Sequence, residues 1–516
     1  MGYMNLENFR VLVDGNEERY SLGTEERKKV EHAFEFLSNY ASDKVIYGIN
    51  TGFGPMAQFK VDPNDLDRLQ YNLIRSHANG SGKMLSPRQI KAVMILRSHS
   101  LALGYSGCSI GLLEQIEKYI EHDIMPIIYQ HGGVGASGDL VQLAHLALGL
   151  IGEGKCYYQG NIVPVSSALE SAGIEPVELK LRDGLATING TSCMTAIGGI
   201  NVIRSQNLLS TAVRISSYLN ELVGSFDDPY SEELNAVKLH NGQQMIARSM
   251  RTFTKDSQLI EKRDEHDFAQ HNGNNGTEVF SKKVQEYYSI RCVPQILGPV
   301  LDAIKNAGIV VEEEINSASD NPIVDVEGQK VFHGGNFHGD YISFEMDKLK
   351  LALIKMTMLL ERQLNYLLND RLNGKFPPFL NAGTLGLNYG MQGMQFTATS
   401  TTAESQALGT SMYTHSIPCN NDNQDIVSMG TNSALMVGTV IENCSEVMAI
   451  TLLALAQATD CNDLYSDLSP SGKALYDKIR ATAPKLQEDH SFSEHLENLK
   501  KIPMEGSLGS ELFVGS

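Results

Sequence analysis

The chain has 516 residues, enough for two or three domains and a large buried core, which excludes small folds that depend on disulfides or metals. Lysine and arginine number 42 against 61 aspartates and glutamates, a formal net charge of −19. This acidity argues against binding to nucleic acid or to an anionic membrane surface. The hydrophobic content of 42% and the charged content of 20% are typical of a globular protein.

The sequence predicts neither a secretory segment nor a membrane span. Residues 1–18 contain no basic stretch followed by an apolar one, and the longest apolar run, residues 447–456, is too short to cross a bilayer. The seven cysteines are scattered without a Cys-x-x-Cys pair, which favours reduced thiols over zinc or disulfides. We therefore expect a cytoplasmic protein that binds neither nucleic acid nor a membrane.

The first third of the chain mixes short extended runs with helices. Residues 45–48 predict a short extended piece, which enters the glycine-rich stretch 48–55. This stretch must be a loop because glycines and a proline interrupt it. Loops of this kind can form lids over a site.

Long helical patterns begin at about residue 191. In residues 342–369 apolar side chains recur at spacings of three and four and define one helix face, which the glycine and prolines at 374–378 end. Similar patterns cover residues 195–223, 296–315 and 433–458. Helices of about 25 residues would each be about 40 Å long. The sequence thus predicts a mainly α fold, an elongated central bundle of long helices with a smaller mixed N-terminal region.

Three segments are expected along the chain. The N-terminal region, residues 1–190, contains the lid loop and the most informative glycine-rich turn. The long-helix bundle occupies residues 191–470, and residues 471–516 form a helical, polar tail. Since the bundle is one core, the length does not require three independent domains.

The turn is Gly-Gly-Val-Gly-Ala-Ser-Gly-Asp-Leu at residues 132–140, followed by a helical stretch. One interpretation is structural: Ser137 or Asp139 caps the helix. A nucleophile elbow would need glycine in place of Asp139, and a phosphate loop would need a lysine that the stretch lacks. A third interpretation is chemical, because Ala-Ser-Gly can cyclise on itself.

Cyclisation would require the turn to press the nitrogen of Gly138 against the carbonyl of Ala136. Ring closure and the loss of two waters would then leave an imidazolone whose methylidene carbon is the Cβ of Ser137. Glycine suits the third position because no Cβ obstructs the close approach. The product is an electrophile that unmodified side chains cannot supply.

This segment resembles the signature of the aromatic amino acid ammonia-lyase and aminomutase family, which forms 4-methylideneimidazol-5-one (MIO) from Ala-Ser-Gly. The similarity covers nearly the whole chain, and it implies an ammonia-lyase/fumarase-like fold without an external cofactor or a metal. The other matching motifs are YGINTGFG at 47–54, INGT at 188–191, VQEYYSIRC at 284–292, SDNP at 319–322, GGNFH at 334–338 and NQDIVSM at 423–429.

The family removes ammonia from an α-amino acid, which requires loss of a weakly acidic β-proton and activation of the amine. An electrophile that takes the amine addresses the second requirement. The resemblance implies that Tyr47 is the base and lies on a mobile lid loop. Read locally, Tyr47 would be a packing aromatic.

The resemblance assigns further roles around the electrophile. Arg291 matches the fork that pairs with the substrate carboxylate, a task that suits a guanidinium. Phe337 matches the aromatic residue beside MIO. The polar matches are Asn189 and Gln424, which hydrogen-bond the MIO ring or the bound amino acid, and Gln285 and Tyr288, which lie in a second layer.

Two histidines suggest a metal only superficially. His266 and His271 lie in an acidic stretch, DEHDFAQH at 264–271. The family that the chain resembles uses no metal. We therefore expect a solvated polar loop there.

The resemblance implies that substrate selectivity depends on Ser76 and His77. Histidine lyases of the family have Ser-His at this place, but they carry glutamate where this chain has Gln424. The combination of His77 with Gln424 resembles a bacterial branch of tyrosine ammonia-lyases. A neutral Gln424 offers no charge to an imidazolium, whereas His77 can hydrogen-bond a phenol. The sequence therefore predicts conversion of L-tyrosine to 4-coumarate and ammonia.

Three alternatives remain open at this point: a histidine ammonia-lyase that forms urocanate, a tyrosine aminomutase that returns ammonia to the β-carbon, and a helical scaffold that has lost its chemistry. The intact catalytic residues argue against the scaffold. The resemblance also implies a homotetramer with active sites shared between subunits.

Overall fold

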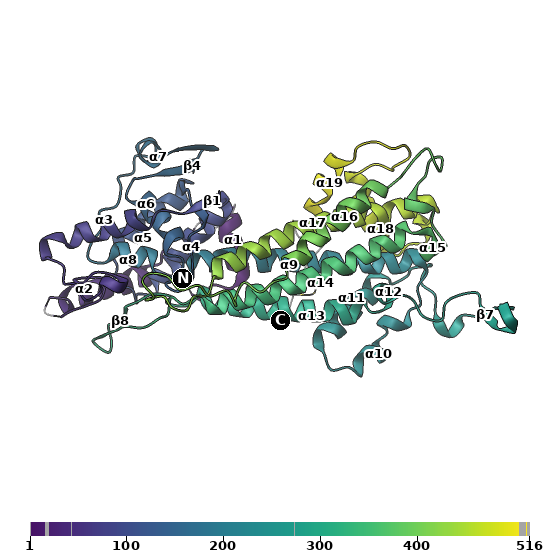
Figure 1. Cartoon of the computed structure of the whole chain (residues 1–516), viewed down its shortest axis with the longest axis horizontal. Coiled ribbons are helices and arrows are strands. Elements are labelled where there is room, and N and C mark those ends of the chain that lie inside the picture. Colours follow the sequence, from purple (N-terminus) through teal and green to yellow (C-terminus); the bar gives the residue numbers. More distant parts are fainter. Residues whose placement is uncertain (1, 16–19, 43, 273, 505–511, 513–516) are drawn as a thin grey trace. The chain divides into compact units, whose positions relative to one another are not determined.

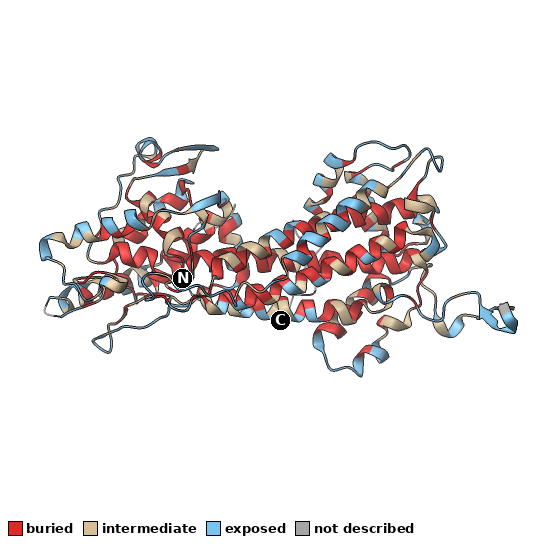
Figure 2. Ribbon diagram, viewed as in Figure 1, coloured by how far each residue is buried: buried red, intermediate tan, exposed pale blue. Residues whose placement is uncertain are grey.

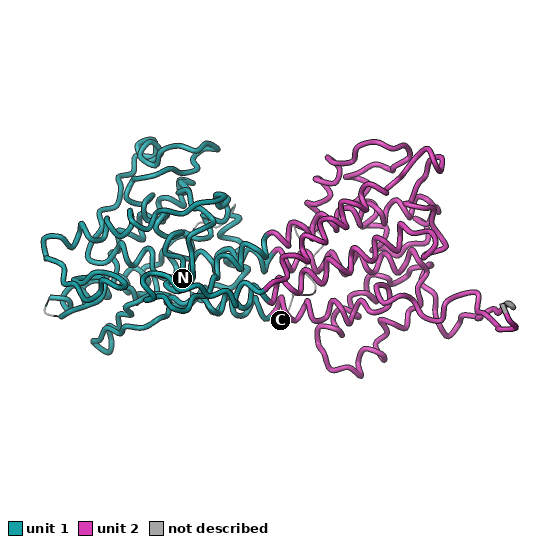
Figure 3. Tube along the Cα trace, viewed as in Figure 1, with its two compact units in different colours: residues 1–203, 306–347, 411–438 teal, residues 204–305, 348–410, 439–516 magenta. Residues whose placement is uncertain are grey.

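A computed structural model of the chain describes residues 2–15, 20–42, 44–272, 274–504 and 512. The fold is mainly α, with a few short antiparallel strands, as Figure 1 shows. This confirms the predicted fold class. The chain divides into two compact units, each built from three separate stretches (Figure 3). Unit 1 consists of Met1–Ile203, Asn306–Asp347 and Ser411–Gly438, and unit 2 of Arg204–Lys305, Lys348–Thr410 and Thr439–Ser516.

The four predicted long helices are present. They are α9 (Ser192–Val223), α13 (Val293–Ile315), α14 (Asp340–Leu368) and α17 (Gly430–Cys461). Buried residues are concentrated along them (Figure 2). Each begins two or three residues before its apolar pattern does, because the first turn of a helix is set by capping groups rather than by apolar spacing.

One described helix, α17, is long and apolar enough to cross a membrane by length and composition. Of its most apolar window of 18 residues, 83% is buried inside the structure. The apolar run at 447–456 lies within this helix. A core helix of a soluble protein passes the same test.

Unit 1 contains the predicted mixed region. The strand β1 (Ser81–Met84) pairs with β3 (Tyr129–His131), while β2 (Met125–Pro126), β4 (Lys155–Tyr158) and β5 (Asn161–Pro164) form a three-stranded sheet and β8 (Ile323–Asp325) pairs with β9 (Lys330–Phe332). The helices are α1 (Leu6–Asp14), α2 (Thr24–Tyr40), η1 (Gly54–Met56), η2 (Pro63–Asp65), α3 (Leu66–His77), α4 (Pro87–Ala102), α5 (Ile110–Glu121), α6 (Leu140–Leu150), α7 (Val165–Ala172) and α8 (Asp183–Ile188).

Unit 2 contains a single described hairpin, β6 (Gln270–Asn272) with β7 (Glu278–Phe280). Its shorter helices are η3 (Asp228–Tyr230), α10 (Glu232–Ala236), α11 (Asn241–Phe253), η4 (Arg263–Glu265), η5 (Asn274–Gly276), α12 (Tyr288–Arg291), α15 (Asp370–Asn373), η6 (Pro378–Leu380), α16 (Gln392–Ala407), η7 (Tyr465–Asp467), α18 (Pro470–Thr482), α19 (Ser493–Leu499) and α20 (Lys501–Met504). The last three lie in the expected tail, except that α18 begins one residue before it; residues 505–511 and 513–516 are outside the described residues. The division into residues 1–190, 191–470 and 471–516 stays a prediction.

One local expectation is wrong, and a second holds only in part. Residues 47–50 form turns rather than an extended piece, because Asn50 Oδ1 accepts the amide of Ile46 at 2.9 Å and Gly48 has a positive φ of +74°. The stretch with His266 and His271 is not simply a solvated loop. His266 Nδ1 lies 2.8 Å from Glu261 Oε2, its ring packs 4.6 Å from that of Phe268, and β6 follows.

Candidate active site

The Ala136-Ser137-Gly138 turn connects β3 to α6 and is tightly folded. Backbone bridges join Gly135 and Ala136 to Gly138, only two or three residues further on. Gly138 has a φ of +68°, and a Cβ built on it would lie 2.0 Å from the carbonyl oxygen of Gly190. Because an atom cannot approach a backbone oxygen so closely, only glycine fits this position.

Three distant segments are bound to this turn by backbone hydrogen bonds. The amide of Gly339 donates to Gly135 O at 3.0 Å, that of Met429 to Val134 O at 2.9 Å, and that of Asp139 to Gly190 O at 2.8 Å. Phe337, Gln424 and Asn189 lie on these same three segments. The backbone thus brings three predicted site residues to the turn.

Asp139 caps a helix, but a different one from the helix expected. It makes no side-chain cap on α6; its fully buried carboxylate instead accepts the amides of Cys193 and Met194 at the start of α9, both at 2.8 Å. Thr431 Oγ1 donates to the other oxygen. Burial raises the pKa of Asp139 to about 6, although these hydrogen bonds oppose the shift.

Ser137 is held by Gln424 rather than by a helix cap. Gln424 Nε2 donates to Ser137 Oγ at 2.8 Å, and the thiol of Cys419 donates to Gln424 Oε1 at 3.3 Å. The backbones of Cys419 and Gln424 also exchange two hydrogen bonds, of 3.1 and 3.3 Å. The amide of Gln424 is therefore fixed at both ends and is almost fully buried.

Asn189 is buried at the C-terminal end of α8. No donor among the described residues reaches its Oδ1. A buried acceptor without a partner costs free energy, about 1–3 kcal/mol. The side chain can therefore accept a hydrogen bond from a bound molecule.

Tyr47 lies at the base of the predicted lid loop. Its hydroxyl accepts the amide of Gly54 at 3.1 Å, and its ring lies edge-on to that of Phe53 with 6.1 Å between centroids. The base of the loop is anchored by Ile46 and Ile49, which are buried in a cluster with α2 residues. In the structure the loop runs past residue 55, since the amide of Gly52 donates to Phe59 O at 3.0 Å, and its far end carries two exposed apolar side chains, Met56 (65% exposed) and Phe59 (61% exposed).

His77 is the last residue of α3, which packs against α6 and α8. Its Nδ1 lies 2.8 Å from the carbonyl oxygen of Leu73. Since a carbonyl oxygen only accepts, this contact assigns the proton of the neutral ring to Nδ1. The other nitrogen, Nε2, is then an acceptor.

The remaining three residues, Gln285, Tyr288 and Arg291, lie in unit 2 and line one cavity of about 670 Å³. The guanidinium of Arg291 donates to the backbone oxygen of Glu286 and lies 4.5 Å from the ring centre of Tyr288. Within the described chain no carboxylate forms an ion pair with Arg291. Eight of the eleven predicted site residues therefore belong to unit 1 and three to unit 2.

Several residues that shape the site were not predicted from the sequence. Gln70 is buried and spans Gly48 O at 3.1 Å and the amide of Leu185 at 3.0 Å, which ties the lid base to α8. Cys419 and Thr431 orient Gln424 and Asp139. The only feature of the sequence that could have indicated these residues was their position near the motifs. No group of three metal-ligating side chains occurs among the described residues.

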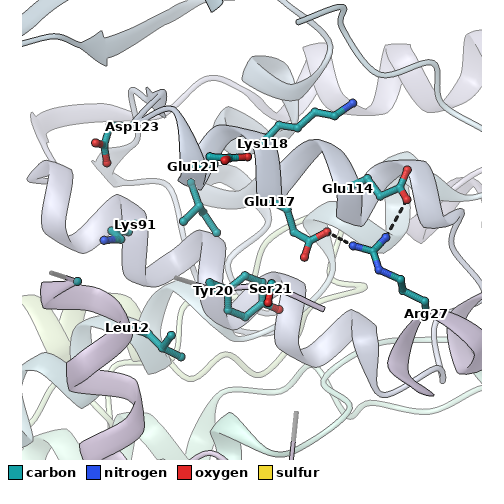
Figure 4. Close-up of a pocket in the computed structure, with 12 residues that line it drawn as sticks. Leu12, Tyr20, Ser21, Arg27, Lys91, Glu114, Glu117, Lys118, Glu121 and Asp123 are labelled. Carbon is teal, nitrogen blue, oxygen red and sulfur yellow. Dashed lines mark hydrogen bonds and ion pairs between the residues drawn. The ribbon is translucent and has the colours of Figure 1, made fainter. Parts of the chain in front are cut away.

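A cavity of about 610 Å³ in unit 1 lies apart from these residues (Figure 4). Arg27 bridges Glu114 at 2.8 Å and Glu117 at 2.6 Å on one side of it. The lining also includes two lysines, two further acidic residues and five uncharged residues, so the two signs of charge nearly balance. None of the predicted site residues lines it.

Comparisons with known proteins point to one family. The profile of a family described as "Aromatic amino acid lyase" matches residues 4–481. A tyrosine ammonia-lyase of Cupriavidus metallidurans is 37% identical over 476 residues, 91% of this chain and 88% of that protein. A histidine ammonia-lyase of Geobacillus thermodenitrificans is 36% identical over 457 residues, which are 89% of this chain and 87% of that protein. A tyrosine aminomutase from Streptomyces globisporus, solved by X-ray crystallography, is 34% identical in sequence. The two structures match with a TM-score of 0.91, covering 98% of this chain and 96% of that one.

Proposed function

The chain belongs to the aromatic amino acid lyase family of MIO-dependent ammonia-lyases and aminomutases, and from this premise we propose that it converts L-tyrosine to 4-coumarate and ammonia. The observation that carries the proposal is the turn at Ala136, Ser137 and Gly138. Its left-handed glycine lies against Gly190 with no room for a side chain, and a backbone bridge joins Ala136 to Gly138, the two residues that cyclisation links. These residues therefore fit the MIO group.

When formed, MIO supplies an electrophilic methylidene carbon that takes the substrate amine. The chain's own residues would bind and orient the substrate beside it. Asn189 Oδ1, which has no donor within the described chain, can accept from the amine. Phe337, half-buried on the segment bound to Gly135, would cover the ring.

Tyr47 is proposed as the base that takes the β-proton. Its hydroxyl accepts from Gly54, so closure of the lid loop and the position of the base are linked. A base must lie within hydrogen-bonding reach of the proton that it removes. The anchored loop base and exposed loop end support a lid that moves at its far end only.

Arg291 is proposed to bind the substrate carboxylate, with Tyr288 and Gln285 beside it. Its guanidinium has a backbone oxygen as acceptor but no carboxylate partner in the described part of the chain, so its charge is available. We further propose a cytoplasmic homotetramer in which the unit 2 residues of one copy serve the unit 1 turn of another.

The preference for tyrosine rests on His77 and Gln424. With Nδ1 bound to Leu73 O, Nε2 of a neutral His77 accepts from the phenol of tyrosine. A site built to bind a hydroxyl rejects the analogue that lacks it by ~10⁴–10⁵. Two alternatives have specific support: Ser76-His77 also matches histidine lyases, and the solved tyrosine aminomutase shares the fold at 34% identity.

The test is an ultraviolet assay of the purified protein with tyrosine, histidine and phenylalanine in parallel, together with Ser137→Ala. We expect 4-coumarate as the main product, and an intact mass two waters below that of the unmodified sequence. Ser137→Ala should lack both activity and the ring's absorbance, because alanine has no hydroxyl to lose. Full activity of this variant would refute the MIO assignment. Comparable turnover of histidine would refute the substrate, and accumulation of β-tyrosine would identify an aminomutase.

A further inference from the structure

The end of α3 is bound to α6 by a histidine side chain. His145 lies on α6, and its Nε2 accepts the amide of Gly80 at 2.9 Å. Gly80 follows His77 by three residues. We propose that His145 is a positioning residue for substrate selectivity, which fixes the end of α3 and with it the ring of His77. The proposal rests on the proposed function, in which His77 binds the phenol of tyrosine.

The last turn of α3 lacks the left-handed cap that commonly ends a helix. Its C-cap, Ala78, has a φ of −76° and a ψ of 55°. Asn79 bonds to this turn instead: its amide donates to His77 O at 2.8 Å, and its side chain donates to Ser76 O at 2.9 Å. Ser76 and Asn79 are both exposed. Because helix ends fray, the position of His77 depends on what holds the residues that follow it.

Gly80 fits closely against β3 and α6. A Cβ built on it would lie 3.0 Å from His131 O, 3.0 Å from His145 Nε2 and 3.2 Å from a methyl carbon of Val141. The His145 ring in turn packs edge-on to that of Tyr129, with 5.1 Å between the ring centroids. Since α6 begins just after the ring-forming turn, this contact fixes the end of α3 relative to the turn itself.

The bond to Gly80 requires one form of the His145 ring. A backbone amide only donates, so Nε2 must be unprotonated and the proton of the neutral ring lies on Nδ1. Burial lowers the pKa of His145, which favours the neutral ring. His77 has the same tautomer, because its Nδ1 lies against Leu73 O. Each Nε2 is therefore an acceptor, that of His145 for the protein backbone and that of His77 for the phenol of the substrate.

The experiment compares three substitutions of His145 that differ in where they place an acceptor. His145→Gln puts an amide oxygen near the position of Nε2, His145→Asn has a shorter side chain that does not reach Gly80, and His145→Leu has no acceptor. The ultraviolet assay gives kcat and KM of each purified full-length protein for tyrosine and for phenylalanine. The ratio of the two kcat/KM values is the selectivity, and it does not depend on the fraction of protein that is folded.

Selectivity for tyrosine over phenylalanine should fall about 3- to 10-fold in His145→Leu and in His145→Asn, because the acceptor of His77 loses its fixed position. The loss should appear in the KM for tyrosine, with kcat within about 2-fold of the parent. His145→Gln should keep the parent selectivity to within about 2-fold. His122→Leu is the matched control: it removes an exposed histidine whose Nδ1 also contacts a helix carbonyl, at the end of α5, and it should leave the selectivity unchanged.

A double mutant tests whether the effect passes through His77. In His77→Leu the phenol has no acceptor, so adding His145→Leu should change the selectivity by less than about 2-fold. Unchanged selectivity in both His145→Leu and His145→Asn, an equal loss in His145→Gln, or a full further loss in the double mutant would overturn the proposal. A parent that does not prefer tyrosine would instead refute the proposed function.

Discussion

The two parts of the candidate site are built in opposite ways. The Ser137 turn in unit 1 is held by backbone hydrogen bonds with three distant segments, and its third residue, Gly138, has no room for another atom. The Arg291 cavity in unit 2 rests on the four-residue helix α12, where Tyr288 is 70% exposed. Covalent chemistry needs atoms fixed in a single geometry, whereas capture of a carboxylate needs an available charge.

The buried carboxyl groups of the two parts, Asp139 and Glu286, also differ in the groups that surround them. Near the turn, burial raises the pKa of Asp139 to about 6, and its hydrogen bonds go to the backbone and Thr431. Near the cavity, burial also raises the pKa of Glu286, but Lys282 and Lys283 act against the shift. Both oxygens of the carboxyl group at the turn are thus bound within the fold, while the cavity concentrates positive charge.

Gly138→Ala should have the largest effect. The added Cβ meets the oxygen of Gly190 and also strains a left-handed residue, so we expect a loss of about 3–5 kcal/mol in the free energy of unfolding and no ring absorbance. Gly160→Ala is the matched control: its φ is +79°, yet nothing lies within 4 Å of the new Cβ. It should lose only about 1–2 kcal/mol. Equal losses in chemical denaturation would show that the turn is no tighter than an ordinary hairpin loop.

Arg291→Met should lower kcat/KM by about 30- to 1,000-fold, because the substrate carboxylate loses its charged partner. Arg291→Lys keeps the charge but not the fork, so its loss should be smaller. The free energy of unfolding should change by less than about 1 kcal/mol, since Arg291 has no ion pair in the described chain. Steady-state kinetics and denaturation measure the two effects.

Co-expression of Arg291→Met with Ser137→Ala extends this test to the assembly. If unit 2 of one copy completes the turn of another, mixed oligomers contain some intact sites and recover activity. If each site lies within one chain, every site carries one defect. Absence of recovery in purified mixed oligomers would therefore contradict shared sites.

Asp139→Asn should change the pH dependence of stability. A carboxyl with a raised folded pKa binds more protons when folded, so the parent loses stability as pH rises from about 4 to about 6. Asparagine does not titrate. Relative to the parent, the variant should therefore gain about 3 kcal/mol between pH ~4 and pH ~7, as measured by urea unfolding across that range. Parallel profiles would mean that Asp139 does not titrate in this way.

The long helices could be predicted because their apolar spacing is local information. Their starts could not, since the group that caps α9 is Asp139, more than fifty residues earlier in the chain. The extended piece at 45–48 was wrong because a side chain, Asn50, and a left-handed Gly48 turn the backbone. Such local bonds compete with strand pairing without changing the apolar pattern.

The position of the turn and the family were predictable from sequence, and the comparisons confirm the family. The partners that hold the turn were not, because Gly190, Gly339 and Met429 contact it through their backbones. A contact made through the backbone places little restriction on which side chain the residue carries, so the sequence does not reveal it. Gln70 is similar: an ordinary polar side chain acquires its role only from distant partners, Gly48 and Leu185.

The partners of the turn are spread along the chain, and this fixes the order in which they become available during translation. A ribosome adds residues in order, so the nascent polypeptide already contains Ser137 long before Gln424 and Thr431 exist. The backbone bonds from Gly339 and Met429 are equally late. The ring-forming turn therefore reaches its final geometry only when more than four-fifths of the polypeptide has been made, and a truncated product would remain without its electrophile.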